Sequence, residues 1–186
     1  MILPVYVFGQ PILRKEGRFI KEEEMPEIKI LIENMWETMY ASHGVGLAAH
    51  QIGRDLRLFI MDSVQVEEDM DMGKGFKKIF INAEKISEEG EIWTFEEGCL
   101  SFPEIRGNVD RPSKITIKYR DLDFVEHVET FDGFNARVIQ HEYDHTIGEL
   151  FIEKFKPLKK RLLKKRLDLI KVGEAKAGYP TRPYRK

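Results

Sequence analysis

The sequence lacks the features that mark secreted and membrane-spanning proteins. Cys99 is the only cysteine among 186 residues, so no disulfide forms within the chain and a reducing, cytoplasmic setting is expected. No apolar run approaches the roughly 20 residues that a membrane-spanning helix needs. Residues 1–8 are apolar but have no basic lead-in, and Gly9-Gln10-Pro11 follows, so an extended segment is predicted rather than a signal peptide.

Nucleotide-binding motifs and internal repeats are also absent. The glycine-rich stretch at residues 44–53 has the wrong spacing for a dinucleotide fingerprint, and no Lys-Ser/Thr pair follows it as in a phosphate loop. Small residues at this density let the backbone approach a neighbouring element or a ligand. By itself the stretch is interpreted as a tight loop, with a ligand contact as the alternative.

The length and composition are those of a globular domain with an uneven charge. Hydrophobic residues make up 42% and charged residues 33%. We predict one domain over residues 1–172, followed by a mobile tail over residues 173–186. Residues 151–186 hold 13 basic and 3 acidic side chains on an otherwise acidic chain, which suggests an anionic partner contacted through this end.

The most informative stretch is Gln140-His141-Glu142-Tyr143-Asp144-His145, which fits the pattern H-E-x-x-H. On a helix, His141 and His145 share one face, so both imidazoles can reach one metal ion. Glu142 is rotated by about 100° and can reach a water at that metal without ligating it. The alternative is a surface helix with two solvated histidines.

The flanking residues predict the helix that carries this motif. Asp132 is a candidate N-cap, Gly148 a candidate stop, and Phe134 and Val138 continue the histidine face. Two histidines on an inward face are costly unless their nitrogens are satisfied, and a metal ion satisfies them. His43, His50 and His127 are given no metal role.

Other segments are assigned from their hydrophobic periodicity. Helices are predicted at residues 26–40 and 158–172, the latter basic on one side and apolar on the other through Leu158, Leu162, Leu163, Leu167 and Ile170. Strands are predicted at residues 58–61, 79–81, 91–95, 100–102, 115–119 and 124–131, and a solvated acidic loop at residues 62–78.

Cys99 supplies a third ligand candidate. A lone cysteine in such a chain is by default a small buried hydrophobe. Here it lies in a glycine-containing turn between two extended runs, in the same chain as an inward-facing histidine pair. One thiolate and two imidazoles leave a fourth position for water, which is the pattern of a catalytic site.

Three ordered motifs resemble the peptide deformylase family. Gly44–Gln51 matches GΦGΦAAxQ, Glu97–Ser101 matches EGCΦS, and Gln140–His145 matches QHExDH, where Φ is an apolar residue. The resemblance covers roughly residues 1–170. It implies an α+β fold with antiparallel and mixed sheets around a central helix that carries the HExxH motif.

The resemblance also implies the reaction and its metal. The expected activity is removal of the N-formyl group from the N-terminal formylmethionine of nascent polypeptides, with release of formate. Fe(II) is the expected metal, with Zn(II), Ni(II) or Co(II) as possible substitutes. Glu142 is then the general base, and the family's oxyanion donors correspond to Gln51 and to the backbone N–H of Leu100.

The same resemblance assigns substrate contacts. Val45 and Gly46 are expected to pair with the extended peptide, joined by the segment before Cys99, including Glu97. The other implied contacts are the methionine-pocket residues Phe95, Phe134 and Val138, with Val45 and His141 as walls, and Arg106 near the peptide backbone. Glu97 is alternatively a support for the metal site through Arg111, or both charges are solvated. Arg137, where many relatives have an apolar residue, either rims the pocket or points to solvent.

The basic segment at residues 158–172 resembles the C-terminal helix by which some family members contact the ribosome. The alternative is a terminal helix that docks on the body of the protein and leaves its charged face in solvent. We expect no DNA or membrane partner. Two competing functions remain at this point: a zinc peptidase whose third ligand is Glu149, and a ribosome- or RNA-binding module with a structural metal.

Overall fold

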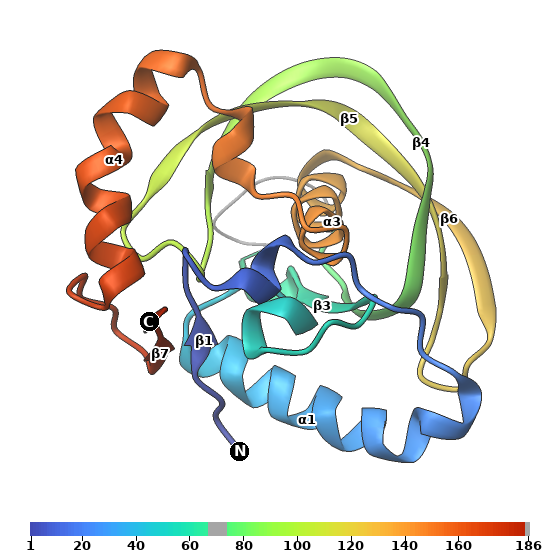
Figure 1. The fold of residues 1–186 in the computed structure, drawn as a ribbon. Coiled ribbons are helices and arrows are strands. Elements are labelled where there is room, and N and C mark those ends of the chain that lie inside the picture. Colours follow the sequence, from blue (N-terminus) through green and yellow to red (C-terminus); the bar gives the residue numbers. More distant parts are fainter. Residues whose placement is uncertain (67–73, 185–186) are drawn as a thin grey trace.

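The computed structural model describes residues 1–66 and 74–184 and has an α+β fold (Figure 1). A five-stranded antiparallel sheet has the order β2-β3-β4-β5-β6, and a separate parallel pair joins β1 to β7. The strands are β1 (Val5–Tyr6), β2 (Gly46–Ala48), β3 (Leu58–Asp62), β4 (Lys77–Gly98), β5 (Arg106–Arg120), β6 (Glu126–Asp132) and β7 (Thr181–Arg182). The α-helices are α1 (Met25–Ala41), α3 (Gly133–Thr146) and α4 (Pro157–Val172). Short 3-10 turns are η1 (Pro11–Arg14), η2 (Glu22–Glu24), η3 (Ala49–Ile52), η4 (Val64–Val66) and η5 (Phe151–Lys154).

The two longest strands curve around α3 (Figure 1). The strands predicted at residues 79–81 and 91–95 are both parts of β4, which runs for 22 residues against β5. The pairing is interrupted between Ile81 and Glu84, between Lys85 and Ser87, and between Glu89 and Ile92. Such bulges bend a strand and increase its twist, so the sheet arches over the helix instead of lying flat.

Helix α3 follows directly from β6, as the sequence predicts. Asp132 occupies the N-cap position, but its side chain makes no capping hydrogen bond. Residues 136–146 are all buried, so the alternative of a surface helix with solvated histidines is wrong. The chain leaves the helix through Gly148, whose φ of 77° favours glycine.

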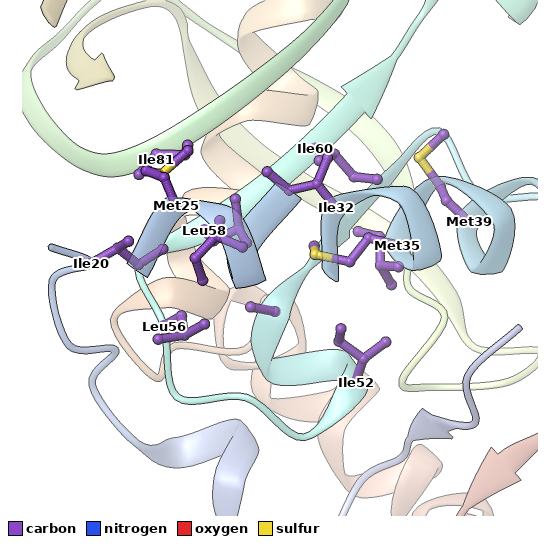
Figure 2. Close-up of a cluster of buried hydrophobic side chains, with 13 residues drawn as sticks. Ile20, Met25, Ile32, Met35, Met39, Ile52, Leu56, Leu58, Ile60 and Ile81 are labelled. Atoms are coloured by element: carbon purple, nitrogen blue, oxygen red, sulfur yellow. The ribbon is translucent and has the colours of Figure 1, made fainter. Parts of the chain in front are cut away.

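The predicted N-terminal helix is present as α1, and its apolar stripe packs on the sheet. Ile32, Met35 and Met39 are buried in one cluster with Leu58 and Ile60 of β3. Figure 2 shows this cluster between α1, β3 and the η3 turn. The η3 turn carries the end of the glycine-rich stretch, so the cluster fixes the position of that stretch next to α3.

The helix predicted at residues 158–172 is present as α4, whereas the segment after it differs from the prediction. Helix α4 packs on the body through the buried Ile170 and the partly buried Leu163 and Leu167, whereas Leu158 and Leu162 are 69% and 72% exposed. No regular structure is predicted from sequence after Val172. Instead, Thr181–Arg182 forms β7, which pairs in parallel with β1 and brings both chain ends together (Figure 1).

The acidic loop predicted at residues 62–78 is only partly visible. Asp62 ends β3, Val64–Val66 forms η4, and β4 begins at Lys77, while residues 67–73 of this prediction lie outside the described residues. Within the described ranges, no helix is both long and apolar enough to cross a bilayer.

His50 makes folding stability depend on pH. Its ring is fully buried, and this burial lowers its pKa from 6.5 to about 4. Between about pH 6.5 and about pH 4, His50 is therefore protonated in the unfolded chain but stays neutral in the folded protein. Stability is lost as the pH falls from about 6.5 to about 4, by up to about 3 kcal/mol.

Urea unfolding of metal-free protein at about pH 7 and about pH 4.5 measures this loss. His50→Leu, which cannot titrate, should lose about 2–3 kcal/mol less stability between the two pH values than the unsubstituted chain does. Equal losses in both proteins would contradict the assignment.

Candidate metal centre and substrate cavity

Three side chains that could hold a metal ion, those of Cys99, His141 and His145, converge where α3 meets the end of β4. Helix α3 places His141 and His145 one turn apart, and their ring centroids lie 5.2 Å from each other. Cys99 follows β4 directly, and its Sγ lies 3.2 Å from Nε2 of His145. One donor atom from each of the three residues lies within 4.8 Å of the others. Cys99 thus forms one compact group with two histidines that follow it by 42 and 46 positions in the sequence.

Cys99 lies at the start of a turn. The strand predicted at residues 100–102 is wrong: the N–H of Phe102 donates to the carbonyl of Cys99 at 2.9 Å, which closes the chain into a turn. The N–H of Leu100 has no acceptor among the described residues. In a continued β-strand the Leu100 N–H could have bonded to a neighbouring strand. In the turn it remains free, next to the thiol of Cys99.

Glu97 fixes the orientation of the His141 ring. Nδ1 of His141 donates to Oε2 of Glu97 at 2.9 Å, because a carboxylate only accepts, and this leaves Nε2 for a metal. Burial alone would raise the pKa of Glu97, but hydrogen bonds from His141 and Arg111 outweigh it and hold that pKa well below its usual range. Glu97 is therefore an anion throughout the neutral range.

Glu97 is itself held by two buried arginines. Arg111 donates from Nε to Oε1 at 2.7 Å and from Nη2 to Oε2 at 3.1 Å, so the predicted pairing is present and the solvated alternative is wrong. Nη1 of Arg111 continues to Asp144 of α3 at 2.7 Å. The ion pairs thus connect the end of β4, β5 and α3 in a single buried network.

Arg137 also belongs to this network, which corrects the expectation that it could point to solvent. The residue is only 2% exposed. Its Nη1 donates to Oε1 of Glu97 at 2.9 Å and to the carbonyl of Val109 at 3.0 Å, and its Nη2 donates to the carbonyl of Trp93 at 2.7 Å. It also contributes to the wall of the cavity next to the histidines.

Glu142 lies buried beside the histidine pair. Burial raises its pKa to about 7, and Oε2 has no partner among the described residues. Its carboxyl group packs directly on Gly46, where an added Cβ would come within 2.5 Å of Oε1. A glycine at position 46 is thus required by the close approach of Glu142 to strand β2.

Gln51 is oriented toward Cys99 by the backbone. The N–H of Ala48 donates to its Oε1 at 2.8 Å, which identifies the side-chain oxygen and turns Nε2 the other way. Nε2 lies 3.5 Å from Sγ of Cys99 and 3.3 Å from Oγ of Ser101. The amide N–H groups are therefore directed at the group formed by Cys99 and the histidines.

One cavity of about 400 Å³ joins these residues to the expected substrate contacts. Its lining includes the predicted residues Val45, Gly46, Gln51, Phe95, Glu97, Cys99, Leu100, Arg106, Phe134, Val138, His141 and Glu142. Arg106 lies at the rim, 65% exposed and paired with Glu96. Tyr179 also lines the cavity; sequence reasoning missed it because nothing in residues 173–186 predicts a return to the body.

The donor set fits a first-row transition-metal cation. A thiolate and two imidazoles are the ligand types that such ions prefer, and the carboxylate on His141 is the usual outer partner of a ligating histidine. The peptidase alternative requires Glu149 as a ligand, but Glu149 is half exposed and pairs with Lys154. Among the described residues, the ligand group contains only Cys99, His141 and His145.

Comparison with known proteins gives one consistent family. The family model described as "Polypeptide deformylase" matches residues 2–161. The "Peptide deformylase" of Flavobacterium johnsoniae is 48% identical over 96% of this chain and 94% of its own length, and that of Cytophaga hutchinsonii is 44% identical over 96% of each. The crystal structure of a peptide deformylase from Legionella pneumophila superposes with a TM-score of 0.78 at 35% identity, covering 90% of this chain and 94% of that one.

Removing the Arg137 cation should destabilise the fold strongly. Arg137→Met takes away one of the two arginines that neutralise the buried Glu97, and breaking such a pair costs about 3–5 kcal/mol. Arg14→Met is the matched control, because Arg14 is 46% exposed and pairs with an exposed glutamate. Its expected cost is about 0–1 kcal/mol. Urea unfolding measures both, and similar losses would contradict the role of Arg137.

Proposed function

Because the chain belongs to the polypeptide deformylase family and is an enzyme that removes the N-formyl group from nascent polypeptides, we propose that the central cavity is its active site and assign roles to its residues. The observation that carries the proposal is the convergence of Cys99 on His141 and His145 with Glu142 beside them. The resemblance predicts α3 as the central helix that carries the ligands, and its burial supports this.

Cys99, His141 and His145 would hold the metal. Fe(II) is the proposed native ion, with Zn(II), Ni(II) or Co(II) as substitutes. When bound, the cation supplies Lewis acidity that lowers the pKa of water and polarises the formyl oxygen. Glu97 keeps Nδ1 of His141 protonated and so presents Nε2 as the ligating atom. Since its carboxylate is engaged by His141, Arg111 and Arg137, Glu97 is assigned to this support rather than to the substrate.

Glu142 is the proposed general base. Its Oε2 has no protein partner within the described ranges, so it can accept the proton of the attacking water. The same carboxyl group then delivers a proton to the amine that leaves. Gly46 keeps this carboxyl group in place, because any side chain at position 46 would displace it.

Gln51 and Leu100 are the proposed oxyanion donors. Attack on the formyl carbon places negative charge on its oxygen, and the donors must be in position before that charge forms. The Gln51 amide is held by Ala48, and the Leu100 N–H is free of any acceptor in the described structure. One such donor is typically worth about 3–4 kcal/mol of transition-state stabilisation.

The peptide substrate would add to the free edge of β2. The N–H of Asp62 donates to the carbonyl of Val45, and polar groups alternate sides along a strand. The N–H and carbonyl of Gly46 therefore face away from β3, toward the cavity. Main-chain pairing there gives affinity with little demand on the later side chains of the peptide.

The methionine side chain would occupy the apolar part of the cavity. The rings of Phe95 and Phe134 lie edge to face with centroids 5.7 Å apart, and Val138 and Val45 line the same space. Arg106 at the rim is placed near the peptide backbone. We propose that the enzyme acts in the cytoplasm, where nascent chains arise, and that α4 contacts the ribosome.

Two substitutions separate metal binding from proton transfer. Cys99→Ser should bind the metal weakly, whereas Glu142→Gln should keep its metal and lose at least about 100-fold in kcat, because only the general base is removed. Metal content after anaerobic Fe(II) loading and formate release from a formyl-methionyl peptide are measured on the same samples. Native metal affinity in Cys99→Ser, or normal turnover in Glu142→Gln, would contradict the respective role.

The basic face of α4 should determine ribosome binding. Lys164 and Lys165 are exposed on α4, and changing both to glutamate should weaken co-sedimentation with ribosomes and flatten its salt dependence. Lys21 and Lys29, exposed elsewhere, give a control variant with the same change in charge. Both variants should deformylate a free peptide normally. Equal ribosome binding by the two variants would refute the contact.

A further inference from the structure

The end of the chain returns from α4 to the N-terminal strand. The N–H of Val5 donates to the carbonyl of Pro180 at 2.9 Å, and that of Val7 donates to the carbonyl of Arg182 at 3.3 Å. Nε2 of Gln10 donates to the carbonyl of Pro183 at 2.8 Å. These bonds hold residues 180–183 against β1, and Figure 1 shows β7 beside β1. The preceding residue, Tyr179, lines the cavity.

Tyr179 holds the turn that follows Cys99. Its hydroxyl donates to the carbonyl of Leu100 at 2.7 Å, and its ring lines the cavity. The next carbonyl, that of Ser101, accepts from the N–H of Phe8, just after β1, at 2.9 Å. Two successive carbonyls of the turn are therefore held from segments at opposite ends of the chain, which are themselves paired with each other.

We propose that Tyr179 is a positioning residue for deformylation, which fixes the peptide groups around Leu100 so that the Leu100 N–H stands ready for the oxyanion. This inference rests on the proposed function. The turn lies outside the sheet ladder, so its geometry depends on the few bonds made to it. A donor that must be in place before charge develops loses much of its effect when it is displaced by about 1 Å.

The geometry separates this role from substrate binding and from folding. The Tyr179 hydroxyl acts on a carbonyl of the turn and not on Gly46, where the peptide would pair. Its loss should therefore lower kcat and leave KM nearly unchanged. The ring, which remains in Tyr179→Phe, still fills its part of the cavity wall.

The test compares Tyr179→Phe with Tyr184→Phe. The control also removes one tyrosine hydroxyl from the C-terminal segment. Among the described residues the Tyr184 hydroxyl makes no hydrogen bond, and Tyr184 is bonded only through its backbone N–H, which donates to the carbonyl of Lys171. In Tyr179→Phe, kcat on a formyl-methionyl peptide should fall about 3- to 10-fold, the loss expected for one neutral hydrogen bond, with KM within about 2-fold. Tyr184→Phe should leave both unchanged.

A second readout does not depend on turnover. The N–H of Phe102 donates to the backbone carbonyl of Cys99 within the turn. Hydrogen–deuterium exchange of this N–H therefore reports opening of the turn. Exchange at Phe102 should be about 3- to 10-fold faster in Tyr179→Phe than in Tyr184→Phe. Unchanged kcat in Tyr179→Phe would overturn the proposal, as would an increase in KM alone. Unchanged exchange at Phe102 would show that Tyr179 does not hold the turn and would overturn it as well.

The same experiment keeps the two proposals apart. If the unsubstituted holoenzyme releases no formate, the proposed function fails, and the exchange at Phe102 alone decides whether Tyr179 holds the turn. If formate is released normally by all three proteins, the proposed function stands and the positioning role of Tyr179 is refuted.

Discussion

The site depends on one buried carboxylate. Glu97 lies at the end of β4, and its two oxygens accept from Arg111, Arg137 and His141, which belong to β5 and α3. Burying an unpaired anion would cost several kcal/mol, so the fold is stable only when these partners are in place. The same bonds set the His141 tautomer and hold the strand end that carries Cys99 close to α3. A single electrostatic requirement thus couples the stability of the fold to the geometry of the proposed metal ligands.

The curved sheet covers this network and shields it from solvent. Irregular pairing bends β4 and β5 over α3, so a helix that carries a glutamate, two histidines and an aspartate can be buried from residue 136 to residue 146. On the opposite side, β2 ends the sheet and leaves one edge open next to Glu142. Edge strands are prone to pair with other chains. Here, an edge that carries only three residues and opens into the cavity suits an extended peptide of an incoming substrate.

The ends of the chain contribute to the same place. Residues after α4 reach the turn behind Cys99 through Tyr179, while Leu158 and Leu162 of α4 remain exposed. Only residues 173–178 therefore separate α4, the proposed ribosome contact, from Tyr179, which bonds to the turn that contains the proposed oxyanion donor. Sequence reasoning gave no indication of this arrangement, because β7 has only two residues and its pairing with β1 is a contact between distant segments.

The sequence by itself determined the chemistry. H-E-x-x-H at helical spacing predicts two ligands and a base on one helix, and with Cys99 and the glycine-rich stretch it indicates the family, because these features follow from local periodicity and residue type. Tertiary structure decided the rest. The burial of Arg137, the length of β4, the turn at Leu100 and the return of Tyr179 depend on contacts between residues far apart in the chain. Long-range packing selects among conformations that local sequence leaves open. The candidate ligands and, as one of two alternatives, the Glu97–Arg111 pair could therefore be predicted, whereas the places of Arg137 and Tyr179 could not.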